Sequence, residues 1–260
     1  SIPHRTAAVL SAAPPGPAPL RPHRTAPHRT VPRRGVAGIR RTSTVRRLPT
    51  VDPAAQTDPM RLTDIVAPDT PAARGALALA REYQSPALTA HALRSWFWAE
   101  AFARVDGIHD IDHELLYVAA VLHDIGTVTA FDNHTISYEH AGGHVAVALT
   151  SGAGWEQARR QRVLDVIVRH NWPAVDPAMD AEGYLLEIAT GLDISGARPD
   201  ALPEDFRRDV LARYPRGALA AEFGACVVDQ AARKPDTAAR RLVDGGIVAK
   251  LAANPLEQLR

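Results

Sequence analysis

Cysteine is nearly absent from this sequence, because Cys226 is its one representative among 260 residues. A lone cysteine excludes a framework of intramolecular disulfides and fits a reducing compartment, so we expect a cytoplasmic protein. Long apolar runs are missing as well. No stretch approaches the roughly 20 residues that a membrane-spanning helix needs, so we expect no membrane partner.

Acidic residues are missing from the first part of the chain. Residues 1–51 contain no Asp or Glu, although ten arginines lie there. The formal net charge of +1 hides this asymmetry, so the rest of the chain must carry an acidic excess. The basic segment is rich in Pro, Arg, Ala and Thr and repeats the run PHRTA. Such a composition cannot bury enough apolar surface to offset the entropy of ordering, so we predict a disordered tail over residues 1–58.

Targeting and nucleic-acid binding are the alternatives to an inert tail, because the segment is basic and free of acids. The tail has no aromatic residue that could stack on bases, which argues against a nucleic-acid partner. It also lacks the apolar core of a secretory signal, and its prolines would interrupt an amphipathic transit helix. We therefore exclude it from the fold and assign residues 59–260 to a single domain.

Strand signals are also absent, since no alternating apolar pattern bounded by turns stands out. From about Met60 onward the apolar residues recur at helical spacing, and Thr70 followed by Pro71 is typical of a helix start. These patterns predict an all-α helical bundle. The expected helices cover residues 71–83, 89–105, 112–123, 137–149, 155–170, 181–192, 203–214 and 219–233.

Histidine and aspartate recur at the ends of these helices. His91 lies in the first turn of one predicted helix, His123 and Asp124 end another, and Asp193 ends a third. Each has apolar neighbours and is expected to face the interior, where a carboxylate is costly unless it is paired or bound to a cation. Two His and two Asp could meet at a divalent metal such as Zn, Mn or Fe. A hydrogen-bonded core histidine or a helix cap is the simpler alternative for each residue taken alone.

The order of these residues resembles the HD-domain metalloprotein superfamily. The match consists of a helical His91, the pair His123 and Asp124 within LHDIGT, and the distal Asp193. The resemblance implies an all-α HD fold in which these four residues hold one divalent ion. Zinc is the first expectation for that ion, with iron and manganese as alternatives.

A narrower likeness is to the cyanamide hydratase-like group of the superfamily, over residues 88–196. Three segments carry it, namely HALRSWFWAEAF (91–102), SYEHAGGHVAVAL (137–149) and VIVRHNW (166–172). This resemblance implies addition of water to a small molecule, such as conversion of cyanamide to urea. Hydrolysis of a nucleotide or another phosphoester is the alternative activity, and a non-catalytic HD scaffold is a third.

The residue three positions after Asp124 bears on this choice. Superfamily members that act on phosphate carry motifs similar to HDIGK or HDxxE, in which the last residue is Lys or Glu. This chain has Thr127 at that position, as in the hydratase-like group. Thr127 offers neither a positive charge nor a base. Glu139 is therefore predicted to be a catalytic proton carrier beside Asp124, with a helix-capping role as the alternative.

Basic residues are few around the motifs. Arg94 and Arg169 are the nearest candidates for binding phosphate, and Arg169 is expected to pair with an acid such as Asp165, one helical turn earlier. A small or neutral substrate is therefore favoured. The aromatic residues that follow Arg94 (Trp96, Phe97 and Trp98, and further on Phe102) are interpreted as core, although one or two of them could line a cavity.

The remaining histidines give further hypotheses. His134 and His170 are predicted, together with Thr127, to lie around the substrate. His140 and His144 stand one helical turn apart and could form a second metal site with His170, an arrangement that would favour phosphate chemistry. The expected partner is a small-molecule substrate, and a homo-oligomer is left open.

Overall fold

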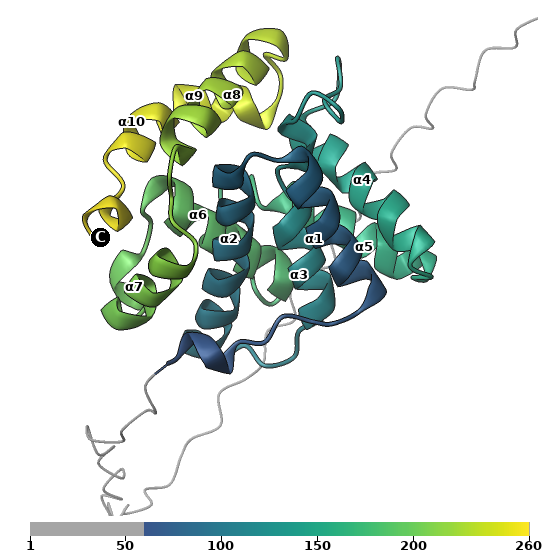
Figure 1. Ribbon diagram of the computed structural model, residues 1–260. Coiled ribbons are helices and arrows are strands. Elements are labelled where there is room, and N and C mark those ends of the chain that lie inside the picture. The colour runs from purple at the N-terminus through teal and green to yellow at the C-terminus, as the bar shows by residue number, and fades with distance from the viewer. Residues whose placement is uncertain (1–59, 260) are drawn as a thin grey trace, which may run out of the picture. The chain divides into compact units, whose positions relative to one another are not determined.

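The computed structural model of this protein describes residues 60–259. Every regular element among them is helical, which confirms the predicted all-α class (Figure 1). The tail predicted over residues 1–58 lies outside the described part of the chain. Within that part, no helix has both the length and the apolar character needed to cross a bilayer.

The elements follow one another with short connections, and their bounds are close to the predicted ones. The α-helices are α1 (Pro71–Tyr83), α2 (Pro86–Val105), α3 (His113–Leu122), α4 (Tyr138–Gly152), α5 (Gln157–Arg169), α6 (Ala181–Ser195), α7 (Glu204–Arg213), α8 (Leu219–Arg233), α9 (Ala238–Asp244) and α10 (Ile247–Ala252). Short 3-10 helices are η1 (Leu62–Asp64), η2 (Ile125–Thr127), η3 (Pro199–Ala201) and η4 (Pro255–Gln258).

Polar N-caps fix where the first helices begin. The hydroxyl of Thr70 accepts a hydrogen bond from the backbone N–H three residues later at 3.1 Å, and that of Ser85 does so at 3.2 Å. A proline follows each of them at the first helical position. Because Ser85 and Pro86 repeat the signal that opens α1, α2 begins earlier than predicted. His91 consequently lies in the second turn of α2 and not in the first.

Helix α3 lies at the centre of the bundle. All its residues from Leu115 to Leu122 are buried, and a helix that is apolar on every side must be surrounded by other elements. It packs against α1, α2 and α5. Because α3 ends inside the bundle, His123 and Asp124 directly after it are buried as well.

The aromatic residues of α2 belong to the same core. Trp96, Trp98 and Phe102 are each at most 2% exposed, and Phe97 packs beside them. None of these four lines the cavity described below. The interpretation of this aromatic run as core is therefore confirmed.

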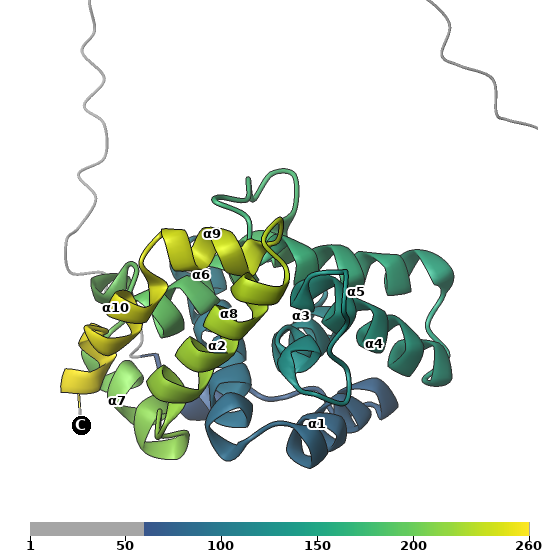
Figure 2. The same cartoon turned by 90° about the horizontal axis from the view of Figure 1, so that it is seen from above.

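The C-terminal helices form a second apolar cluster. Phe223 of α8 and Leu251 of α10 belong to it together with Leu88 of α2. The short helices α9 and α10 were not predicted, because runs of 7 and 6 residues are too short to show a helical period. Figures 1 and 2 show α7 and α10 on one side of α2 and α4 and α5 on the other.

Candidate metal centre

Three side chains converge where α2 passes the end of α3. His91 comes from α2, while His123 and Asp124 directly follow α3, and all three are buried with ligand atoms within 4.8 Å of one another. The two Nε2 atoms lie 3.0 Å apart. Oδ2 of Asp124 lies 3.4 Å from Nε2 of His91 and 3.2 Å from Nε2 of His123. Over residues 60–259, this is the one group of three or more such side chains close enough to share a metal ion.

Oxygen acceptors decide which nitrogen of each histidine carries the hydrogen. Nδ1 of His91 donates to Oδ2 of Asp193 at 2.7 Å, and Nδ1 of His123 donates to the carbonyl oxygen of Ala120 at 2.7 Å. With one hydrogen on Nδ1, an imidazole that acts as a ligand directs the lone pair of Nε2 into the cluster. Two facing lone pairs repel each other unless a cation or a proton lies between them.

Asp124 completes the cluster as a buried carboxylate that lies beside both histidines without a hydrogen bond. Neither carboxylate oxygen has a hydrogen-bond partner in the described part of the chain, although the side chain is only 2% exposed. Burial raises the pKa of this carboxyl, but His123 and His91 outweigh burial and hold the pKa well below its usual range. A buried charge without hydrogen bonds is costly. Two imidazole lone pairs and one carboxylate at a single point are a donor set that suits a divalent cation.

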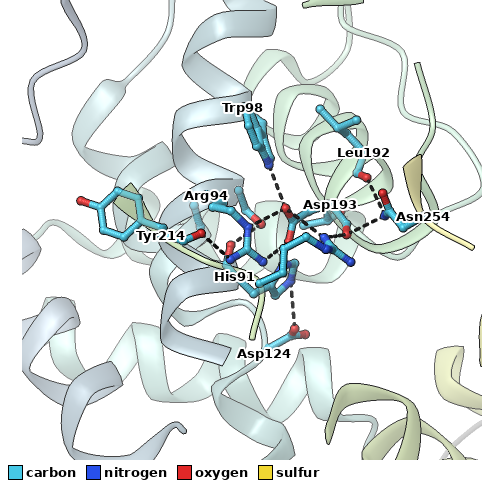
Figure 3. A network of polar contacts seen from close by, with 12 residues as sticks. His91, Arg94, Trp98, Asp124, Leu192, Asp193, Tyr214 and Asn254 are labelled. Atoms are coloured by element: carbon cyan, nitrogen blue, oxygen red, sulfur yellow. Dashed lines mark hydrogen bonds and ion pairs between the residues drawn. The ribbon is translucent and has the colours of Figure 1, made fainter. Parts of the chain in front are cut away.

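Asp193, predicted as the fourth ligand, lies on the other side of His91 (Figure 3). Its Oδ1 accepts hydrogen bonds from Nε of Arg94 at 2.8 Å and from Nε1 of Trp98 at 2.9 Å. Its Oδ2 accepts from Nη2 of Arg94 and from His91, both at 2.7 Å. The structure therefore places this carboxylate behind His91 and outside the group of three.

Asn254 and Arg216, which were not predicted to lie near Asp193, also bond to it. Nδ2 of Asn254 donates to the Asp193 carbonyl oxygen at 3.0 Å, and Nη1 of Arg216 donates to the same oxygen at 2.6 Å. Burial raises the pKa of the Asp193 carboxyl, but Arg94 lowers it well below the usual range. The carboxylate is thus a charged and fully hydrogen-bonded anchor for His91.

The two arginines considered for phosphate binding are both engaged elsewhere. Arg94 is fully buried, and it donates to Asp193 and to the backbone carbonyls of Tyr214 and Pro215. Arg169 pairs with an acid as expected, but the acid is Asp180 and not Asp165. Asp180 lies at the start of α6, where it also caps that helix, and this position was not apparent from helical spacing along α5.

His170 lies at the edge of the cluster, directly after α5. Its ring centroid is 4.8 Å from that of His123, and its Nε2 is 3.9 Å from Oδ1 of Asp124. Its Nδ1 donates to the carbonyl oxygen of Ile167, so Nε2 again offers a lone pair. Burial lowers the pKa of His170 to about 3, which keeps the imidazole neutral.

The glycine after the His-Asp pair allows a close approach of α4. A Cβ atom on Gly126 would lie 2.1 Å from the carbonyl oxygen of Tyr138 and 2.7 Å from the backbone nitrogen of Gly142. Thr127 closes the same turn, because its hydroxyl donates to the carbonyl oxygen of Asp124 at 2.7 Å. The backbone that carries Asp124 is therefore fixed by contacts on both sides.

Several predicted site residues lie away from the cluster. Glu139 is buried but lines a separate cavity of about 330 Å³, together with His140. His134 and His144 are exposed, and His140 contacts the hydroxyl of Ser137 at 2.8 Å. The structure does not bring His140, His144 and His170 together as a metal-binding group.

A cavity of about 140 Å³ opens from the cluster. Its wall contains no Lys or Arg from the described residues, and its C-terminal side comes from α8, α9 and α10. Glu187 of α6 also faces it, a residue that the sequence analysis did not single out. The lining residues are His91, His123, Asp124, Tyr138, His170, Asn171, Trp172, Glu187, Thr190, Gly191, Ile194, Ser195, Phe223, Leu242 and Ile247.

Comparisons with known proteins match the part of the chain that contains the cluster. The family model of the HD domain matches residues 88–193, which run from α2 to Asp193. Two proteins of Saccharomyces cerevisiae, cyanamide hydratase DDI2 and cyanamide hydratase DDI3, are each 32% identical to this chain over 164 residues. The alignment covers 60% of this chain and 73% of each yeast protein.

Proposed function

This chain belongs to the HD-domain family, with yeast cyanamide hydratases among its relatives, and on that premise we propose that it adds water to a small nitrile-like molecule. Cyanamide, with urea as the product, is the first substrate to test. The proposal needs a metal ion to activate the reaction, a cavity of suitable size, and an absence of groups that would select phosphate.

The proposed ligands are His91, His123 and Asp124, holding one divalent ion, with zinc as the first expectation and iron or manganese as alternatives. The unpartnered oxygens of Asp124 and the facing Nε2 lone pairs support this assignment. A bound divalent ion lowers the pKa of water and polarises an electrophile. The chain's own contribution is to present these donors from a buried position at the end of the cavity.

Asp193 and His170 are proposed to complete the site, and each has a different role. Asp193, held by Arg94 and Trp98, orients His91 through Nδ1, as carboxylates behind ligand histidines do in other metal sites. His170 directs Nε2 toward Asp124 from the opposite wall and is available as a further ligand or as a hydrogen-bond partner of the substrate. Asp193 as a direct ligand stays a prediction.

The observation that carries the proposal is the cavity. Its volume of about 140 Å³ is well below the roughly 300–1,000 Å³ of sites for drug-sized ligands, so it suits a molecule of a few heavy atoms. No Lys or Arg of the described chain lines it, and the nearby Arg94 is bound to Asp193. A phosphoester would bring negative charge toward Asp124 and Glu187 with no cationic side chain to offset it.

The test is a paired assay on purified, metal-analysed protein. We expect about one divalent ion per chain, formation of urea from cyanamide, and loss of both the ion and the activity on treatment with a chelator. Hydrolysis of p-nitrophenyl phosphate without urea formation would instead establish the phosphohydrolase alternative. A protein that binds no metal, and whose unfolding does not respond to a chelator, would be an HD scaffold.

A further inference from the structure

Glu187 is a carboxylate on the wall of the metal cavity that makes no fixed contact. It lies on α6, one side of which faces the cavity through Glu187, Thr190, Gly191 and Ile194, spaced as one stripe of a helix. The side chain is half-buried, and over residues 60–259 no hydrogen bond or ion pair holds its carboxylate. Its oxygens are therefore available to whatever occupies the cavity.

Most other polar groups of the cavity either have protein partners or face the three-residue cluster. The three histidines carry their hydrogens on Nδ1 and donate them to protein oxygens. The hydroxyl of Tyr138 accepts from Asn171 at 2.8 Å, and burial raises its pKa well above the usual range, so it is no base at neutral pH. Among the described residues, Glu187 is thus the one carboxylate besides Asp124 that lines this cavity.

We propose that Glu187 is the proton-transfer residue of this site, an assignment that rests on the proposed hydration of a nitrile. The oxygen of water bonds to the nitrile carbon, and one C–N π bond breaks. Glu187 takes the proton released by this water and returns it to the nitrile nitrogen. The product is the hydroxy-imine tautomer, which becomes the amide, urea in the case of cyanamide, when the hydroxyl proton moves to nitrogen. Atoms balance with water as the sole co-reactant.

The electrostatic setting of Glu187 supports this role. Burial raises its pKa, while Arg198 opposes that change from outside the cavity, where it is bonded to Asp106 and Tyr184. A raised pKa brings a carboxyl closer to the neutral range in which a general base is effective. The other ionisable groups that share the cavity with Glu187 are His91, His123, Asp124, Tyr138 and His170.

Glu139, predicted from the sequence for the same task, provides a matched comparison. Glu139 is buried, whereas Glu187 is half-buried, and Glu139 lines the second cavity with Asp236 and Arg241 and not the wall shared by His91 and His123. The variants E187Q and E139Q each replace one carboxylate by an amide of equal size. They differ in which cavity loses its carboxylate.

The experiment measures metal content, cyanamide turnover and the infrared carboxyl signal of both variants. We expect E187Q to retain the wild-type metal content and a similar KM, but to lose about 10²- to 10⁴-fold in kcat together with the acid limb of its pH profile. E139Q should retain turnover. In the metal-free protein, a carboxyl band that titrates above the ordinary Glu range should be absent from E187Q and present in E139Q.

The outcomes separate the two hypotheses. If the wild-type protein makes urea and E187Q does so at the wild-type kcat with an unchanged pH profile, Glu187 is not the proton carrier and the proposed function stands. If E139Q loses turnover instead, the sequence prediction is correct and the present assignment is overturned. If the metal-loaded wild-type protein makes no urea, the proposed function fails and the assignment of Glu187 fails with it.

Discussion

Two buried aspartates, Asp124 and Asp193, lie on opposite sides of His91 and have opposite surroundings. Asp193 accepts hydrogen bonds from Arg94, Trp98 and His91, whereas neither oxygen of Asp124 has a hydrogen-bond partner in the described chain. Both carboxylates are buried, and both have a pKa below the usual range. The difference separates a carboxylate that the fold has satisfied from one that the fold leaves open to a cation.

This contrast assigns different tasks to residues that look alike in the sequence. The Asp193 network is complete without any ligand, so it stabilises the protein and orients His91. The cost of burying Asp124 is offset in part by His91 and His123, but its carboxylate oxygens have no hydrogen-bond partner in the described chain and are open to a cation. Substitution of Asp124 should therefore affect mainly metal binding, whereas substitution of Asp193 should affect mainly stability.

The largest expected effect is the loss of metal binding in the variant Asp124→Ala. The variant loses a ligand and the only negative charge in the three-residue cluster, so we expect loss of the ion and of activity together. Metal analysis and turnover measure both, with Asp200→Ala as a control at a fully solvated carboxylate. Full metal occupancy in Asp124→Ala would remove this residue from the site and end the contrast with Asp193.

A smaller effect, on stability, is expected for Asp193→Asn in the metal-free protein. This change leaves the buried guanidinium of Arg94 without its carboxylate, which costs about 3–5 kcal/mol. Asp124→Asn leaves no guanidinium without a carboxylate and loses only the attraction to His91 and His123, so it should cost less. Urea unfolding in the presence of a chelator compares the two variants, and equal midpoints would show that the two aspartates are equally well satisfied.

The smallest expected effect is a pH dependence that His170 contributes. Its pKa is lowered to about 3 from 6.5, so the unfolded chain binds a proton that the folded one does not, and stability falls as pH drops through this range. The slope is about 1 kcal/mol per pH unit. In the metal-free protein, His170→Gln should flatten the slope between pH 4 and 6, as measured by urea unfolding.

Of the neighbouring groups, Glu187 also contributes above the ordinary Glu pKa, because burial raises its pKa and the folded chain then holds a proton that the unfolded chain has lost. Its contribution to stability grows as pH falls, with the opposite sign to that of His170. Burial lowers the pKa of His91, but the carboxylates of Asp124 and Asp193 raise it above 6.5 overall. The stability from His91 is thus fully present below pH 6.5 and is lost only as pH rises through its folded pKa. The lowered pKa values of Asp124 and Asp193 change the pH dependence of stability only below about pH 3.8. An identical slope in His170→Gln and wild type would show that His170 is not buried as a neutral base.

The sequence alone predicted much of the fold and part of the site. Proline and hydroxyl pairs such as Thr70 and Pro71, apolar periodicity, and the absence of strand patterns are local signals, so the all-α class and most helix bounds followed from them. The missed start of α2 was a local error, since Ser85 and Pro86 carried the same signal. The order of His91, His123 and Asp124 on successive helices similarly identified the cluster and its family.

What the sequence could not determine is which polar groups satisfy one another. Arg94 and Asp193 are 99 residues apart, and Asn254 lies 61 residues beyond Asp193. Whether a buried carboxylate is hydrogen-bonded or left open depends on such distant partners, because hydrogen bonds act over a few ångströms in space and not along the chain. The sequence therefore supplied the donors and the helices that carry them. The tertiary structure alone left Asp124 open to a cation, placed Asp193 behind His91, and brought Glu187 to the cavity wall.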